Sequence, residues 1–158
     1  MPQHDPHTPR VLVVDESEAS RTQVVEALRE AGLQVVALGS AEAALPLWTL
    51  FRPHVVLMTT HAPGFSSVAV ARRLQKLSKD AVPFVYLLDA PDPELRLHVL
   101  ERGHGVDALS KPLETRELVA RVRGCSGSAR QCGAPRVRRT TRWPVSATGS
   151  PRPGRGER

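Results

Sequence analysis

Three groups of polar residues stand at the ends of apolar runs and could do chemistry together. They are Asp15 and Glu16, then Thr59, Thr60 and His61, and then Lys111. Carboxylates are hard oxygen ligands that suit Mg²⁺, and carboxylates with an imidazole can bind zinc or manganese. A metal-dependent phosphotransfer enzyme that uses Asp15, Glu16 and His61 is therefore one hypothesis. A solvent-facing loop histidine is the simpler interpretation of His61, and we favour it.

The elements that must position these residues follow a regular order. Short runs rich in Val and Leu predict strands at residues 10–14, 33–38, 54–58, 83–88 and 106–110. Segments with helical spacing of apolar residues separate them, and Ser17 can cap the first helix. We expect the second helix to begin at Ser40 and to be bent or shortened by Pro46. This alternation predicts an α/β fold with a doubly wound, five-stranded parallel sheet in the order 2-1-3-4-5, helices on both faces, and a site at the carboxyl ends of the strands.

The charge of the chain is divided unevenly along its length. Residues 1–123 hold 14 basic and 15 acidic residues, whereas residues 124–158 hold eight arginines and one acid, so the tail alone is basic. The tail also has six glycines and four prolines without periodicity. We predict a disordered N-terminus at 1–9, one domain at 10–123 and a disordered basic tail at 124–158. No run is long and apolar enough to span a membrane, and we expect a cytoplasmic protein.

The order and the motifs of the predicted domain resemble those of a known family. VLVVDES, PHVVLMTTHAPG, PFVYLLDA and DALSKP occur in sequence from Arg10 to about Arg123. They are similar to the receiver domain of two-component response regulators, including the single-domain chemotaxis receivers, which have a flavodoxin-like fold. The resemblance implies that a histidine kinase phosphorylates an aspartate at the end of the third strand. It also implies two acids for Mg²⁺, a lysine and a hydroxyl that contact the phosphoryl group, and an aromatic ring that changes position.

The match to this functional pattern is partial. Asp15 and Glu16 occupy the positions of the acid pair, and Lys111 occupies the position of the lysine. The aspartate that accepts the phosphoryl group is replaced by Thr59, the hydroxyl residue by Leu88 and the aromatic switch by Ala108. A threonine cannot form an acyl phosphate, and its neutral hydroxyl removes one negative ligand from the metal site. We therefore expect weak Mg²⁺ binding at most, through Asp15 and Glu16, and no required cofactor.

Simpler structural interpretations of the acid pair and the lysine stay open. Asp15 and Glu16 can be the charged start of a helix, where acids interact favourably with the helix dipole. Lys111 can serve only to neutralise Asp15.

These features predict a signalling protein of the two-component class and not an enzyme. We expect it to act through protein contacts, without the usual aspartyl phosphorylation. The resemblance implies a histidine kinase or effector as partner, or a second copy, bound at the face formed by the fourth helix, fifth strand and fifth helix. The alternative is a nucleic-acid-binding protein, in which the arginines of the tail bind phosphates weakly and without sequence preference.

Overall fold

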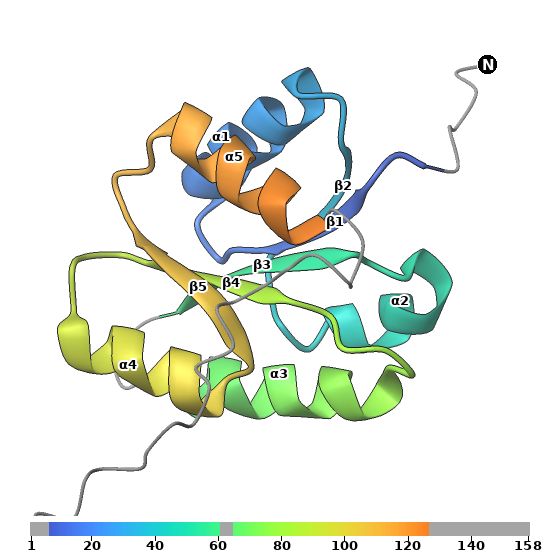
Figure 1. The fold of residues 1–158 in the computed structure, drawn as a ribbon, viewed down its shortest axis with the longest axis vertical. Coiled ribbons are helices and arrows are strands. Elements are labelled where there is room, and N and C mark those ends of the chain that lie inside the picture. Colours follow the sequence, from blue (N-terminus) through green and yellow to red (C-terminus); the bar gives the residue numbers. More distant parts are fainter. Residues whose placement is uncertain (1–6, 61–64, 127–158) are drawn as a thin grey trace, which may run out of the picture.

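The computed structural model describes residues 7–60 and 65–126. Its five strands form one parallel sheet in the order β2-β1-β3-β4-β5, which confirms the order predicted from the sequence (Figure 1). The strands are β1 (Arg10–Val14), β2 (Gln34–Leu38), β3 (Val55–Thr60), β4 (Phe84–Leu88) and β5 (Gly105–Ser110). The helices are α1 (Glu18–Glu30), α2 (Ala44–Phe51), α3 (Phe65–Leu77), α4 (Pro93–Arg102) and α5 (Thr115–Ser126).

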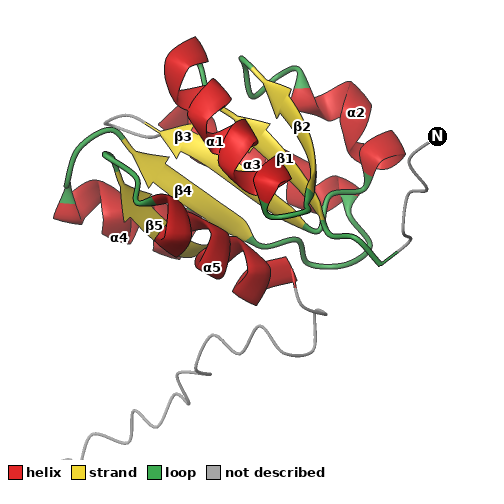
Figure 2. Cartoon of the chain, turned by 90° about the horizontal axis from the view of Figure 1, so that it is seen from above, coloured by secondary structure: helices red, strands yellow, loops and turns green. Residues whose placement is uncertain are grey.

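Helices cover both faces of the sheet, as the notably apolar strands require. Helices α1 and α5 lie on one face, and α2, α3 and α4 lie on the other (Figure 1). Because successive strand side chains point to opposite faces, Val11 and Val13 join the core under α1 and α5, whereas Leu12 and Val14 join the core over α2, α3 and α4. The view from above shows the strands pointing the same way, so that their carboxyl ends meet at one edge (Figure 2).

The helix starts follow local sequence signals. Ser17 caps α1, and its hydroxyl accepts a hydrogen bond from the Ser20 N–H. Asp92 caps α4, and Pro93 takes the first helical position. The second helix begins at Ala44 and not at Ser40, so the predicted start is wrong by four positions. Pro46 is the third residue of this eight-residue helix and lies in its first turn, where a missing backbone N–H is tolerated.

Contacts with the sheet and helix α5 extend slightly past the two predicted boundaries of the domain. The Pro9 carbonyl accepts a hydrogen bond from the Gln34 N–H, so contacts with the sheet begin before Arg10. Helix α5 continues to Ser126, three residues into the predicted tail, and Cys125 packs against the core under α1 and α5. Residues 1–6 and 127–158 lie outside the described part of the chain. None of the described helices is long and apolar enough to cross a membrane.

Candidate functional site

The carboxyl edge of the sheet brings together residues from four strands. Asp15 follows β1, Thr59 lies near the end of β3, Asp89 follows β4 and Lys111 follows β5. Each of them stands two positions after a residue of the core under α1 and α5, which contains Val13, Leu57, Leu87 and Leu109. Strand alternation therefore directs all four toward the same side of the sheet. The predicted association of Asp15, Thr59 and Lys111 at this edge agrees with the topology.

Asp15 is the buried carboxylate of this edge, with 1% of its surface exposed. Its Oδ1 accepts a hydrogen bond of 2.9 Å from the Ser17 N–H, and its Oδ2 lies 3.1 Å from Lys111 Nζ. Burial alone would raise the pKa of Asp15. Hydrogen bonds from the Ser20 hydroxyl, the Ser17 N–H and Lys111 outweigh burial and hold the pKa below its ordinary value. Asp15 is thus a charged carboxylate with a hydrogen-bond partner at each oxygen.

Lys111 joins two carboxylates at this edge. Its ammonium nitrogen lies 3.1 Å from Asp15 Oδ2 and 3.2 Å from Asp89 Oδ1. Its backbone N–H donates to the Leu88 carbonyl over 2.7 Å, which fixes the end of β5 beside the end of β4. The contact with Asp15 agrees with the interpretation that Lys111 neutralises it.

Asp89 was not identified from the sequence as a residue of this site. The available signal was its place directly after a buried strand, the same signal that singled out Asp15. Its side chain is about half exposed, at 48%. Its carboxylate adds a second negative charge near Lys111, on the side of the site away from β1.

Two threonines, Thr59 and Thr60, lie at the end of β3. The Oγ1 atoms of Thr59 and Thr60 are both buried, and neither has a hydrogen-bond partner within the part of the chain that the structure describes. Thr59 is half-buried and pairs with Leu87, whereas Thr60 is fully buried and pairs with Leu88. An unpaired buried hydroxyl is a net cost to the fold, typically on the order of 1 kcal/mol or more.

Leu88 and Ala108 do not join this group of polar side chains. Both are fully buried in the core over α2, α3 and α4. Leu88 pairs in register with Ser110, and Ala108 pairs with Tyr86. The positions expected for a hydroxyl and a mobile ring are thus part of an apolar layer.

The other residues predicted for a metal site are Glu16 and His61. Glu16 is exposed at the start of the loop before α1. His61 lies outside the described residues, so its imidazole is not placed. Within residues 7–60 and 65–126, no three His, Cys, Asp or Glu side chains are grouped to hold a metal ion. Both oxygens of Asp15 already have partners and Thr59 is neutral, so the edge fits Mg²⁺ poorly.

Comparison with known proteins agrees with this geometry. The model of the response regulator receiver domain matches residues 11–123. The DNA-binding response regulator MtrA of Mycobacterium tuberculosis is 33% identical over 114 residues, which cover 72% of this chain and 49% of MtrA. A protein-glutamate methylesterase/protein-glutamine glutaminase of Anaeromyxobacter dehalogenans is 30% identical over 156 residues, 92% of this chain and 44% of that protein. The chain thus spans about half the length of the curated relatives it matches.

Solved structures show the same fold. A response regulator from Thermotoga maritima superposes with a TM-score of 0.67 at 26% identity, over 77% of this chain and 99% of that one. The receiver domain of the Francisella response regulator 1452 gives a TM-score of 0.66 at 23% identity, over 75% and 97%. Together with the strand order and the matched span of residues, these likenesses place the chain in the response regulator receiver domain family.

Proposed function

We propose that this protein is a receiver module of two-component signalling that acts through protein contacts without aspartyl phosphorylation at the usual position. The observation that carries the proposal is Thr59, which stands at the end of β3 on the same side of the sheet as Asp15 and Lys111. The proposal includes a cytoplasmic location, no required cofactor and no turnover of a substrate.

The surroundings of Thr59 give its hydroxyl no help as a nucleophile. A hydroxyl reacts at neutral pH only when an adjacent base takes its proton. Lys111 is engaged by two carboxylates. Asp15 has a pKa below its ordinary value, which makes it a weak base. Neither Lys111 nor Asp15 is therefore suited to take the proton of the Thr59 hydroxyl.

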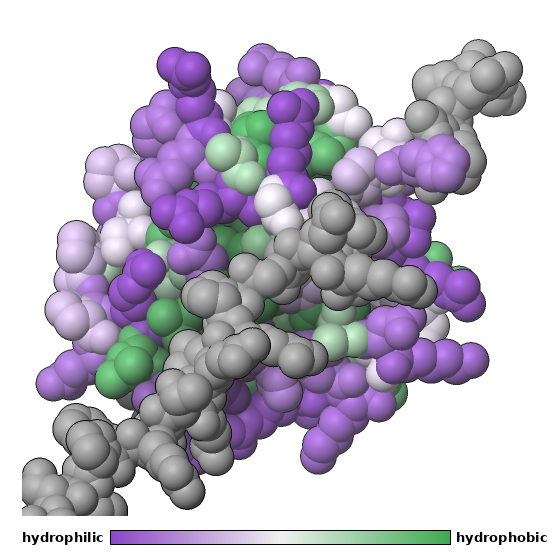
Figure 3. All heavy atoms as spheres, viewed as in Figure 1, coloured by the Kyte–Doolittle hydropathy of each residue, from purple (hydrophilic) through white to green (hydrophobic). Residues whose placement is uncertain are grey.

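The face of α4, β5 and α5 has the features of a docking surface. A chain of ion pairs crosses it: Asp107 on β5 lies 3.7 Å from Arg96 on α4 and 2.9 Å from Arg121 on α5. Leu97 and Val106 are exposed beside this chain, at 56% and 41%. Figure 3 shows a hydrophobic area over α4 among mostly hydrophilic side chains. We propose that this face binds a histidine kinase, an effector or a second copy of the chain.

Phosphorylation is tested with a small-molecule phosphodonor and Mg²⁺ on the full chain. We expect no hydroxylamine-sensitive label. Thr59→Asp should raise the affinity for Mg²⁺ and allow slow labelling, because Asp15, Glu16 and Lys111 are in place. Thr59→Asn is the matched control, because asparagine has the shape of aspartate but carries no charge. Hydroxylamine-sensitive labelling of the unmodified protein at an aspartate would refute the proposal, and Asp15 would be the first residue to examine.

The docking face is tested with one charge placed on it. Leu97→Glu should weaken self-association, measured by light scattering, or the capture of a cognate histidine kinase. Leu77→Glu is the control, because Leu77 is equally exposed, at 54%, and lies at the end of α3. Equal effects of the two substitutions would argue against this face.

The alternative function, nucleic-acid binding, rests on the charge of residues 124–158. Eight arginines against one acid favour contact with phosphates. Binding of DNA or RNA that weakens steeply with salt and is lost when 127–158 are deleted would support it. Deletion from 127 keeps helix α5 complete.

A further inference from the structure

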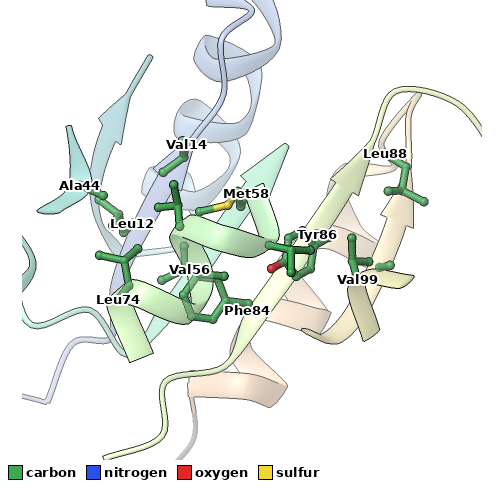
Figure 4. Packing of buried hydrophobic residues seen from close by; sticks show 14 of the residues in the cluster. Leu12, Val14, Ala44, Val56, Met58, Leu74, Phe84, Tyr86, Leu88 and Val99 are labelled. Atoms are coloured by element: carbon green, nitrogen blue, oxygen red, sulfur yellow. The ribbon is translucent and has the colours of Figure 1, made fainter. Parts of the chain in front are cut away.

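Tyr86 lies beside the position where the family resemblance places a mobile ring. Tyr86 on β4 pairs in register with Ala108 on β5, and both side chains are fully buried in the same core. Figure 4 shows Tyr86 beside Val99 of α4 in this core. We propose that Tyr86 occupies the space beside Ala108 and fixes α4 against β5, so that the face of α4, β5 and α5 keeps a single conformation.

The hydroxyl of Tyr86 ties β4 to the end of α4. Its Oη donates a hydrogen bond of 2.6 Å to the carbonyl of Gly103, the residue that caps α4. Burial raises the pKa of the phenol, and the nearby Arg72 opposes this only in part, so the hydroxyl keeps the proton that it donates. If the ring moved away, a buried hydroxyl and a buried carbonyl would both lose their partner.

The ring fits its surroundings closely. A Cβ atom at Gly103 would overlap the Tyr86 hydroxyl, and a Cβ atom at Gly105 would lie 3.1 Å from its Cδ2. On the other side the ring stacks on Phe84 with centroids 6.3 Å apart, and Phe84 stacks in turn on Trp48. The two glycines thus admit the ring, and Phe84 packs against it.

Further contacts link α4 and the connection before it to β5 and the residue after it. Arg96 in the first turns of α4 donates to the carbonyl of Ala108 and pairs with Asp107. Asp89, which precedes α4, pairs with Lys111 after β5. Helix α4 is therefore attached to β5 in its first turn and to β4 just after its last residue. An aromatic side chain moving at position 108 would have to displace Tyr86, and Ala108 has no ring to move.

This inference deepens the proposed function, on which it rests for the role of the face. It can be tested without any partner, because it concerns only the stability of the helix in the free protein. Amide hydrogen exchange of the full chain is the measurement. Tyr86→Phe should speed exchange at residues 99–106 by about tenfold relative to β1 and β3, as expected for the loss of one buried hydrogen bond.

The matched control is Trp48→Phe. It removes another ring donor of the same core, the 2.8 Å bond from Trp48 Nε1 on α2 to Ser78 Oγ just after α3, and keeps a ring at position 48. It should leave the relative exchange at 99–106 unchanged. Equal exchange of this segment in the unmodified protein and in Tyr86→Phe would overturn the inference.

A second measurement needs no variant. NMR relaxation dispersion of the unmodified protein should show no microsecond-to-millisecond exchange at residues 93–110. Two interconverting conformations of α4 would overturn the inference even if a partner binds the face. Conversely, if α4 shows no relaxation dispersion and no partner binds this face, the inference stands and the docking proposal is refuted.

Discussion

Lys111 Nζ lies 3.1 Å from Asp15 Oδ2 and joins residues that are 96 positions apart in the chain. Asp15 is 1% exposed and Lys111 is 16% exposed, so the pair lies largely out of water. Because removal of one partner leaves a buried charge without compensation, we expect Lys111→Met to lower the free energy of unfolding by about 2–3 kcal/mol, somewhat less than for a fully buried pair. Urea unfolding measures this. Lys79→Met is the exposed control and should stay within about 0.5 kcal/mol.

The depressed pKa of Asp15 predicts a specific response to acid. The unfolded chain has the ordinary pKa of 3.8, and the folded pKa is lower. The stabilising contribution of the charged carboxylate is therefore complete above 3.8 and is lost as the pH falls through the folded pKa. Asp15→Asn should be less stable near neutral pH, and the difference from the unmodified protein should shrink below about pH 3.8. Asp80→Asn, at an exposed position, should show no such convergence in urea unfolding.

Much of the fold could be predicted because its determinants are local. Runs such as VLVV (11–14) are apolar at every position, which indicates strands buried on both faces, and RVLVV forms β1 within the predicted limits. The start of α2 was misplaced because Ala and Leu continue the helical pattern back to Ser40, while Pro46 marks the first turn. The end of α5 was misplaced for the opposite reason. Gly124 signals a stop, but Cys125 still packs on the core and offsets its cost.

The candidate site was predictable only in part. Asp15, Thr59 and Lys111 could be placed together because parallel strands end at the same edge. The pairing of Asp89 with Lys111 could not be predicted, since it depends on the path of the connection between β4 and α4. The position of Tyr86 beside Ala108 could not be predicted either. It depends on the register of β4 with β5 and on the absence of side chains at Gly103 and Gly105, which no local pattern reveals.

The buried hydroxyl of Thr59 predicts a substitution without cost. Its Oγ1 has no hydrogen-bond partner among the described residues. Thr59→Val keeps the shape and removes the unsatisfied group, so the free energy of unfolding should stay the same or rise by up to about 1 kcal/mol. Ser78→Ala is the contrasting control, because the Ser78 hydroxyl accepts from Trp48 and donates to the Leu74 carbonyl. It should lose about 1 kcal/mol in the same urea titration. A clear loss for Thr59→Val would show that its hydroxyl has a partner.

The pairing of Ala108 with Tyr86 predicts that one side chain of this pair must be small. Ala108→Tyr places a second ring beside a fully buried one, and such overpacking should lower the free energy of unfolding by about 2–3 kcal/mol. In the Tyr86→Leu background the new ring has room, so the same substitution should cost at least about 1 kcal/mol less, a coupling expected only for side chains in contact. In the Trp48→Phe background the cost should be unchanged within about 0.5 kcal/mol, because Trp48 lies on α2, away from β5. Equal costs in all three backgrounds, measured by urea unfolding, would mean that Tyr86 does not occupy the space beside Ala108. A coupling confined to Tyr86→Leu would mean that the ring carried by β5 in the family and the ring carried by β4 here compete for one space beneath α4.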